Sequence, residues 1–518
     1  MKFRNLMIQG TASDVGKSVL TAGICRILYE NGEKVAPFKS QNMSLNSFIT
    51  KDGKEMGRAQ VVQAEAAGIE PRAEMNPILM KPTGDKNAQI IFNGEVYGDL
   101  SAIDYDTKKV YFKTKIKEIY ETLDKDFDSI ILEGAGSPAE INLRERDLVN
   151  MGMAELVDAP VILVGDIDKG GVFASLYGTI ALLPKEEQKR IKGVIINKFR
   201  GDIKLLENGL KMLEDLINIP VLGVVPYFRL EIDEEDAVSD RLKVVRETKE
   251  DEISVKIIRM PYMSNFTDFN VLFSLDGINA SYAKDKNDLS DADIIIIPGS
   301  KSTVKDLMYL KDNGYEEVLK AQKEKGSYIF GICGGFQMLG TEIRDTGKIE
   351  GDIETIKGLG LLDIVTEFED KKVMTQVKCS ITEDGSLLSG LEDFTVEGYE
   401  IHMGRTVFVG ANAKEFLRIK SSLGKSDMRV EGYSSVDSKV YGTYVHGIFD
   451  TLGFTKKIAS NIRNSKGISY KEKETKFKTY KDIKEAEYTK LAAILRDSLD
   501  LEKIYDILDG KDVGKNYK

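Results

Sequence analysis

The feature that most limits how this chain can fold is a repeated pattern of short apolar runs separated by stretches with helical periodicity. In the first 230 residues these runs occupy positions 6–9, 34–38, 129–132, 161–164, 193–196 and 221–225. A second series occupies 253–258, 292–297, 327–332 and 440–445. Short apolar runs alternating with helices are typical of buried parallel strands. The sequence therefore predicts an α/β fold with two doubly wound domains, the first of them built on a mostly parallel sheet.

Charged residues mark the break between the two series, at 231–236 and 246–251. A charged stretch without periodicity is typical of a linker. We therefore predict a first domain over 1–232, a linker over 233–251 and a second domain over 252–464. A charged tail follows over 465–518, with an amphipathic helix near 485–499.

Composition excludes several classes of protein. The 73 basic and 84 acidic side chains give a net charge of −11, which disfavours a nucleic-acid-binding protein. No apolar run is long enough to predict a membrane span. Three cysteines are too few for a disulfide framework and fit a cytoplasmic protein, and two histidines exclude a histidine-rich metal site.

Residues 10–18 read Gly-Thr-Ala-Ser-Asp-Val-Gly-Lys-Ser and connect a predicted strand to a predicted helix. A phosphate-binding loop is expected at this point, although its usual first glycine is replaced by Thr11. We predict that the loop from Thr11 to Gly16 and the Lys17 ammonium bind phosphate groups. The Ser18 hydroxyl is predicted to bind Mg²⁺.

Polar residues at other strand ends are further candidates, because ligands of open α/β sheets bind there. Glu133 ends the strand at 129–132 and is a predicted Mg²⁺ ligand. Lys39 can neutralise phosphate charge, and Asn197 can hydrogen-bond a base edge. Asp166 and Asp168 are candidates for metal ligands, or for residues that hydrogen-bond the ligands and hold them in place. Each of these four can equally be an ordinary polar loop residue.

The second predicted site centres on Cys333, in the string Gly-Ile-Cys-Gly-Gly at 331–335. Small residues flank a nucleophile on a sharp strand-to-helix turn, and a helix N-terminus favours the thiolate form. We predict Cys333 as a nucleophile. Cys25, on the apolar face of the first helix, and Cys379, in a strand-like stretch, are predicted to be structural.

A nucleophilic cysteine needs a base, and the chain offers His402 and His446. His446 follows the last predicted strand, so we predict that it is the base. His402 is predicted to contact substrate or to hold structure. The backbone N–H groups at Gly299 and Gly334 are predicted to form an oxyanion hole.

These features together resemble the cobyric acid synthase family, glutamine-dependent amidotransferases of cobalamin biosynthesis. The resemblance extends from about residue 5 to about residue 455. It rests on seven strings, at 9–18, 38–44, 133–143, 170–174, 197–202, 264–268 and 398–404.

The resemblance also implies roles for individual residues. The N-terminal half is similar to dethiobiotin synthetases, which carry the same loop with a displaced glycine, and this assigns nucleotide and Mg²⁺ roles to Lys17, Ser18 and Glu133. Asp147 falls where the family places a carboxylate tied to the amidation site. The C-terminal half resembles a class I glutaminase, with Cys333 as nucleophile and His446 as base.

One position departs from the triad glutaminases, which usually carry Glu two residues after the catalytic His. Here Ile448 occupies that position, an absence shared by the cobyric acid synthase branch. Asp450 and Glu400 are both candidates for the carboxylate that orients the imidazole, and the sequence does not decide between them.

The activity implied by the resemblance is ATP-, Mg²⁺- and glutamine-dependent amidation of adenosylcobyrinic acid a,c-diamide at its b, d, e and g carboxylates. One alternative is cobyrinic acid a,c-diamide synthase, which has the same domain plan. The strings at 40–44 and 264–268 favour the first. Another is a non-catalytic partner protein with a P-loop and a glutaminase-like domain, against which the intact Cys333 and His446 argue.

Overall fold

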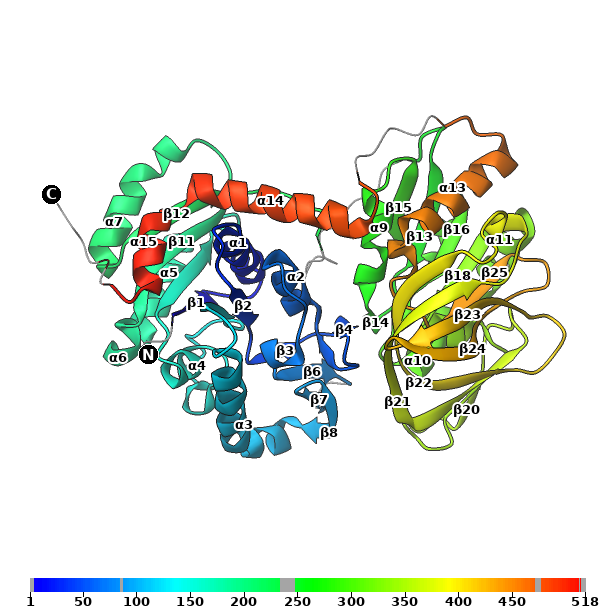
Figure 1. Ribbon diagram of the computed structural model, residues 1–518, viewed down its shortest axis with the longest axis horizontal. Helices are drawn as coiled ribbons and strands as arrows, with labels where there is room; N and C mark the ends of the chain where they lie inside the picture. Colours follow the sequence, from blue (N-terminus) through cyan, green and yellow to red (C-terminus); the bar gives the residue numbers. More distant parts are fainter. Residues whose placement is uncertain (1–3, 84–86, 233–246, 471–476, 512, 514–518) are drawn as a thin grey trace. The chain divides into compact units, whose positions relative to one another are not determined.

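The computed structural model describes residues 4–83, 87–232, 247–470, 477–511 and 513. The chain forms two compact units, each drawn in Figure 1. The first unit comprises Met1–Ser44, Glu55–Glu235 and Lys484–Lys518, and the second comprises Leu45–Lys54 and Asp236–Ile483. Both units are discontinuous in sequence, whereas the predicted domains are continuous.

A parallel six-stranded sheet forms the centre of the first unit, in the order β12-β11-β10-β1-β9-β2. Its strands are β1 (Asn5–Gly10), β2 (Val35–Phe38), β9 (Ser129–Glu133), β10 (Val161–Asp166), β11 (Ile191–Phe199) and β12 (Val221–Pro226). The apolar runs predicted as strands form this sheet, and β1, β9 and β10 are buried along their whole length. Parallel strands buried on both faces need such runs.

Helices and a small mixed sheet surround the central sheet. The helices are α1 (Lys17–Glu30), α2 (Arg58–Ala66), α3 (Ala102–Leu123), α4 (Met151–Leu156), α5 (Val172–Leu182), α6 (Lys185–Gln188), α7 (Glu207–Ile217) and α15 (Leu501–Leu508), with α14 (Tyr480–Ser498) from Lys484 onward. The small sheet has the order β3-β6-β7-β8, with β3 (Gln41–Met43), β6 (Ile78–Pro82), β7 (Asn87–Phe92) and β8 (Glu95–Ser101). The short strand β5 (Glu55–Gly57) precedes α2.

Part of the predicted charged tail belongs to the core of the first unit. In α14, Leu491 and Leu495 are fully buried and pack on α1, where a Cβ on Gly23 would lie only 2.3 Å from Leu495 Cδ1. Arg26 of α1 also pairs with Glu485 at 2.7 Å. The charges of this region therefore line the outer face of a helix whose apolar face is covered.

The second unit is built on an eleven-stranded mixed sheet in the order β15-β13-β16-β18-β25-β24-β23-β21-β19-β20, with β22 paired to β21. Its parallel half contains β13 (Ile253–Ile258), β15 (Ile278–Ala283), β16 (Ile294–Ile297), β18 (Tyr328–Ile332) and β25 (Val440–Thr443). Its other strands are β19 (Glu342–Arg344), β20 (Thr355–Lys357), β21 (Ile364–Ile381), β22 (Thr395–Phe408), β23 (Lys414–Ser422) and β24 (Lys425–Ser434). The α/β class predicted for both units is confirmed, and the long antiparallel strands add to the prediction.

Short elements and helices complete the second unit. They are β4 (Ser47–Ile49), β14 (Met263–Ser264), β17 (Gly299–Ser300), α9 (Asn270–Ser274), α10 (Thr303–Asp312), α11 (Tyr315–Lys325), α12 (Gly334–Leu339) and α13 (Leu452–Lys466). Helix α13 ends two residues beyond the predicted boundary at 464, and residues 233–246 of the predicted linker lie outside the described residues.

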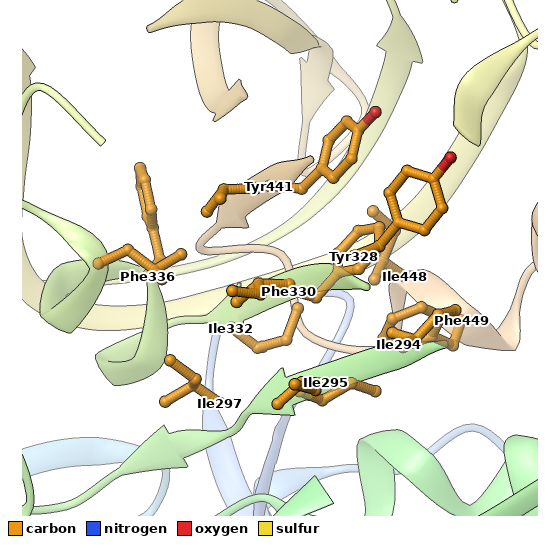
Figure 2. Close-up of a cluster of buried hydrophobic side chains, with 14 of the residues drawn as sticks. Ile294, Ile295, Ile297, Tyr328, Phe330, Ile332, Phe336, Tyr441, Ile448 and Phe449 are labelled. Carbon is orange, nitrogen blue, oxygen red and sulfur yellow. The ribbon is translucent and has the colours of Figure 1, made fainter. Parts of the chain in front are cut away.

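Apolar side chains of β16, β18 and β25 pack together in the core of the second unit (Figure 2). The rings of Phe330 and Tyr441 stack with centroids 5.0 Å apart. Such close packing fixes the strands relative to one another, and with them the loops that follow. Among the described helices, none combines the length and hydropathy that a membrane crossing requires.

Candidate active sites

The loop between β1 and α1 makes a tight turn that two glycines permit. Gly16 precedes α1 with a φ of 95°, in the left-handed region that favours glycine. A Cβ on Gly10 would lie 2.5 Å from the Val15 side chain. Both ends of the loop are therefore crowded, and Gly10, one position before the usual glycine, satisfies the steric requirement of the turn. Thr11 anchors the loop by donating its N–H to Val164 O at 2.9 Å.

The Lys17 side chain bends back across the loop. Its Nζ donates to the Ala12 carbonyl at 3.0 Å and to the Gly136 carbonyl at 3.4 Å. The ammonium is thus held over the backbone that the sequence predicts to surround phosphates.

Glu133, at the end of β9, lies at the centre of a cluster of charged and polar side chains in the first unit. Its Oε1 accepts a hydrogen bond from the Ser18 hydroxyl at 2.8 Å and pairs with Lys39 Nζ at 3.0 Å. Its Oε2 accepts from Gln63 Nε2 at 2.6 Å. Burial alone would raise the pKa of Glu133, but Lys39 and the donated hydrogen bonds outweigh it and lower the pKa, so the carboxylate is ionised.

The structure therefore brings three predicted residues, Ser18, Lys39 and Glu133, into one cluster. The sequence did not point to Gln63, which lies on α2 rather than at a strand end. Within the described residues, no group of three or more His, Cys, Asp or Glu side chains gathers as a metal site. One carboxylate and one hydroxyl nevertheless suit Mg²⁺, which takes much of its coordination from phosphate and water.

Asn197 contacts the phosphate loop itself. Its Nδ2 donates to Val15 O at 2.9 Å, and among the described residues its buried Oδ1 has no hydrogen-bond partner. The other strand-end candidates meet cations, since Asp166 pairs with Lys198 at 3.0 Å and Asp168 with Arg200 at 2.8 Å. The predicted base contact of Asn197 stays a prediction.

Asp147 accepts three backbone hydrogen bonds around the start of α4. Its Oδ1 accepts from the N–H groups of Val149 and Asn150, at 2.8 and 3.0 Å, and its Oδ2 accepts from that of Gly152 at 2.9 Å. These contacts fix the backbone before α4. The Asn150 side chain also accepts a hydrogen bond from the Ala135 N–H and donates one to the Ala135 carbonyl. Asp147 thus supports the loop after β9, and its predicted link to the amidation site stays a prediction.

Cys333 lies on the predicted sharp turn, between β18 and α12, with a φ of 51° that is unusual for a residue other than glycine. A Cβ on Gly335 would lie 2.0 Å from Ile297 O, and one on Gly334 would lie 2.9 Å from Ser300 N. The glycines therefore let the turn approach the neighbouring strand end. The thiol is 8% exposed and points to Ile401 O at 3.6 Å.

His446 and Asp268 complete a triad with Cys333. The Asp268 Oδ2 lies 2.6 Å from His446 Nδ1, which leaves Nε2 for the thiol. Burial alone would lower the pKa of His446, but the charge of Asp268 and the adjacent Cys333 raise it to about 10. The arrangement places a protonated imidazole beside the Cys333 sulfur, as in enzymes whose cysteine attacks a carbonyl carbon.

Neither of the two carboxylates proposed from the sequence holds this position. Glu400 instead binds Arg429 and lies 3.6 Å from His402 Nε2, while Asp450 ends the short turn at Ile448–Asp450. Asp268 is the residue that the sequence analysis missed, although it lies in the quoted string at 264–268. A signal was available: this polar string follows β13, so it emerges at the strand-end edge where ligands bind.

His402 contacts Gly404 and Tyr444. Its Nδ1 lies 2.8 Å from Gly404 O, and its ring stacks on Tyr444 with centroids 3.7 Å apart.

Gly299 approaches the triad closely, since a Cβ there would lie 3.3 Å from His446 Cε1. The backbone at Gly299 and Gly334 therefore borders the triad, where the oxyanion hole is predicted.

Glu431 supports the loop that carries His446. Its carboxyl accepts hydrogen bonds from the Thr443 hydroxyl and the Tyr444 N–H, and the Thr443 carbonyl accepts from Cys333 N–H at 2.8 Å. Burial, reinforced by the neighbouring charge of Glu400, raises the pKa of Glu431 to about 8. The nucleophile turn is thus bonded to the backbone of Thr443, and Glu431 holds Thr443 and Tyr444 in place.

Comparisons with known proteins match the two parts of the chain to two different domain families. Residues 6–236 match the CobQ/CobB/MinD/ParA nucleotide-binding domain, and residues 254–454 match the CobB/CobQ-like glutamine amidotransferase domain. The chain thus joins a nucleotide-binding domain to a glutamine amidotransferase domain.

Full-length relatives narrow the class further. A cobyric acid synthase of Alkaliphilus metalliredigens is 51% identical over 98% of this chain and 100% of its own length. Those of Clostridium acetobutylicum and a Thermoanaerobacter species are 51% and 49% identical, each over 97% of this chain and 98% of their own lengths. The chain belongs to the cobyric acid synthase family.

Changing Asp268→Asn should slow glutamine hydrolysis about 10²–10⁴-fold, because the buried imidazole loses the charge that orients and protonates it. Synthesis from free ammonia should be unchanged. Steady-state glutamate release measures the first and ammonium-dependent product formation the second. The exposed Asp276→Asn serves as the matched control. A wild-type rate in Asp268→Asn would show that this contact is not used.

Glu431 should make stability depend on pH. Its pKa in the folded protein, about 8, lies above the ordinary 4.5, so its stabilising effect is full below pH 4.5 and is lost as the pH rises to 8. Glu431→Gln cannot lose a proton, so the Tm of wild type should fall relative to that of the variant between pH 5 and 8. Thermal melts across this range test it, with the exposed Glu367→Gln as control. A constant difference in Tm would contradict it.

Proposed function

We propose that this chain is a cytoplasmic, ATP- and glutamine-dependent ligase that converts the b, d, e and g carboxylates of adenosylcobyrinic acid a,c-diamide to amides. The observation that carries the proposal is the buried contact of Cys333, His446 and Asp268 in a chain of this family. The three free cysteines fit a reducing compartment, and the net charge of −11 does not favour nucleic acid as a partner.

In the second unit, the Cys333 sulfur adds to the carboxamide carbon of glutamine. His446 donates a proton to the nitrogen, the C–N bond breaks, and ammonia leaves a glutamyl thioester. Water then adds to the thioester carbon while His446 accepts its proton, and the C–S bond breaks to give glutamate. The N–H groups at Gly299 and Gly334 hold the oxyanion of each tetrahedral intermediate.

In the first unit, a substrate carboxylate attacks the γ-phosphorus of ATP, and the bond to the leaving ADP oxygen breaks. Ammonia then attacks the acyl phosphate carbon, phosphate leaves, and the nitrogen loses a proton to give the amide. Thr11 to Gly16 and Lys17 bind and orient the phosphates, with Lys39 adding positive charge. Ser18 and Glu133 would hold Mg²⁺ through their oxygens, and the ion would supply charge neutralisation at the triphosphate.

Asn197 and Asp147 take no part in the bond changes of this scheme and act by positioning other groups. Asn197 fixes the phosphate loop through Val15 and presents its amide oxygen to the nucleotide. Asp147 fixes the loop after β9, and we propose that it sets the position of the carboxylate to be amidated. Of the alternatives, the relatives favour cobyric acid synthase over the a,c-diamide synthase, and the complete triad argues against a non-catalytic partner.

Mass spectrometry of the product tests the substrate and the number of amidations together. The purified chain is incubated with adenosylcobyrinic acid a,c-diamide, ATP and glutamine, and each amidation exchanges one OH for one NH₂. We expect the mass to reach that of the b, d, e and g amide. Amidation of cobyrinic acid at a and c instead would favour the a,c-diamide synthase.

Two variants separate the chemistries of the units. Cys333→Ser should abolish synthesis from glutamine but retain synthesis from ammonium, because the nucleophile acts only in ammonia release. Lys17→Ala should lower synthesis from both nitrogen sources about 100-fold or more, because both need the phosphoryl transfer. Product formation is measured with each source, with the exposed Lys185→Ala as control. Loss of both activities in Cys333→Ser would overturn the separation.

A further inference from the structure

The short strand β17 lies close to both the histidine and the nucleophile turn of the second unit. A Cβ on Gly299 would lie 3.3 Å from His446 Cε1, and a Cβ on Gly334, the residue after Cys333, would lie 2.9 Å from Ser300 N. An oxyanion hole stabilises charge only when its N–H groups are fixed before the charge develops. The contacts that hold β17 in place therefore bear on the rate of glutamine hydrolysis.

The pairing of β17 with β14 supplies few of these contacts. The two strands form a sheet of their own, in which Gly299 lies opposite Ser264. Beyond this pair, the Lys301 N–H donates to Tyr262 O at 2.9 Å. An isolated pair of strands is marginally stable even when the strands are longer than two residues. Side-chain contacts must therefore add to the backbone pairing if β17 is to stay in one position.

Asp306, in the first turn of α10, supplies such contacts to both strands. Its Oδ2 accepts a hydrogen bond from the Ser300 hydroxyl at 2.6 Å, and its Oδ1 accepts from the N–H of Tyr262, just before β14, at 3.1 Å. The Ser300 hydroxyl oxygen in turn accepts from the Ser302 N–H at 3.0 Å. One carboxyl group therefore joins the end of β17 to the start of β14.

The surroundings of Asp306 favour a carboxyl group over its amide. The residue is fully buried, and burial raises its pKa to about 6, although the hydrogen bonds from Ser300 and Tyr262 oppose this rise. A carboxylate accepts on both oxygens, whereas a carboxamide accepts on one oxygen and donates from its nitrogen. An asparagine of the same shape would therefore turn its NH₂ group towards one of the two donors and lose that contact.

Helix α10 is itself fixed in the unit. Leu307 and Leu310 are fully buried in the hydrophobic core. The Thr303 hydroxyl donates to Gln337 Oε1 at 3.1 Å, and Gln337 belongs to α12, the helix that follows Cys333. The helix that carries Asp306 is thus bonded to the helix that begins at the nucleophile turn.

We propose that Asp306 is a positioning residue of the oxyanion hole, which it holds in place through the Ser300 hydroxyl. The inference rests on the proposed roles of Cys333 and of the N–H groups at Gly299 and Gly334. Without the contact to Asp306, β17 would take up several positions beside the nucleophile turn. A donor that must reorganise during the reaction stabilises the oxyanion less, so the rate falls. Asp306 itself acts through Ser300 and transfers no proton.

Ser300→Ala and Asp306→Asn test the contact from its two ends. Each should lower kcat for glutamate release about 10–100-fold, because the oxyanion is held less well. KM for glutamine should change less than about 2-fold, as for an interaction made only in the transition state. The double variant should be no slower than the slower single variant, because both changes remove one interaction.

Asp293→Asn is the matched control. Asp293 is also buried and accepts a backbone N–H, that of Ser254 at 2.9 Å, but it precedes β16, whereas Gly299 follows this strand. The control should keep the wild-type kcat. Synthesis from free ammonia should be unchanged in every variant, because it does not use the oxyanion hole.

Alkylation of Cys333 by iodoacetamide separates positioning from a general loss of structure. The sulfur displaces iodide at a saturated carbon, so this reaction forms no tetrahedral oxyanion. Cys25 and Cys379 are fully buried, so the label counts the folded sites at Cys333. In Ser300→Ala and Asp306→Asn, the rate and extent of labelling should stay within about 2-fold of wild type while kcat falls.

Three results would overturn the inference. They are a wild-type kcat in either single variant, losses that multiply in the double variant, and a loss of alkylation that parallels the loss of kcat. Failure of the proposed function would look different, because Cys333→Ser would then still hydrolyse glutamine.

Discussion

The buried contact between His446 and Asp268 is the interaction on which the candidate site of the second unit depends. An imidazole that is 1% exposed would lose its proton to burial, and the adjacent carboxylate reverses that tendency. Four strands contribute to the site: the polar turn with Asp268 comes after β13, Gly299 after β16, Cys333 after β18 and His446 after β25. Because these strands are parallel neighbours in the sheet, their carboxyl ends meet at one edge.

The sequence was sufficient for the parts of the fold that are coded locally. Apolar runs predicted the parallel strands, and glycine spacing predicted the tight turns at Lys17 and Cys333, since both signals lie within a few residues. The Asp268–His446 contact spans 178 positions, and no local period records such a pair. The two candidates from the sequence, Glu400 and Asp450, each lie within a few positions of a histidine in the chain, and such nearness does not decide the contact.

The first unit shows why polar residues at strand ends are ambiguous. Ser18, Lys39 and Glu133 converge on one another, whereas Asp147 binds the backbone of its own turn and Asn197 holds Val15. A tight loop leaves backbone groups that need partners, and a nearby Asp or Asn side chain satisfies them without any ligand. All five residues are polar, so polarity alone does not separate them. Only the three-dimensional contacts distinguish the side chains that gather with one another from those that support a loop.

The position that departs from the usual triad pattern lies in apolar surroundings. The residue two positions after the catalytic histidine, Ile448, is 1% exposed and lies beside Phe449 in the apolar cluster of Figure 2. A glutamate there would place a charge in apolar surroundings, which costs several kcal/mol unless the charge is paired. Supplying the carboxylate from the turn after β13 leaves this cluster apolar. Asp268 Oδ1 also lies 3.5 Å from the Tyr399 hydroxyl, which donates to Ser47 O at 3.1 Å. The triad is thus connected to Ser47 through Tyr399.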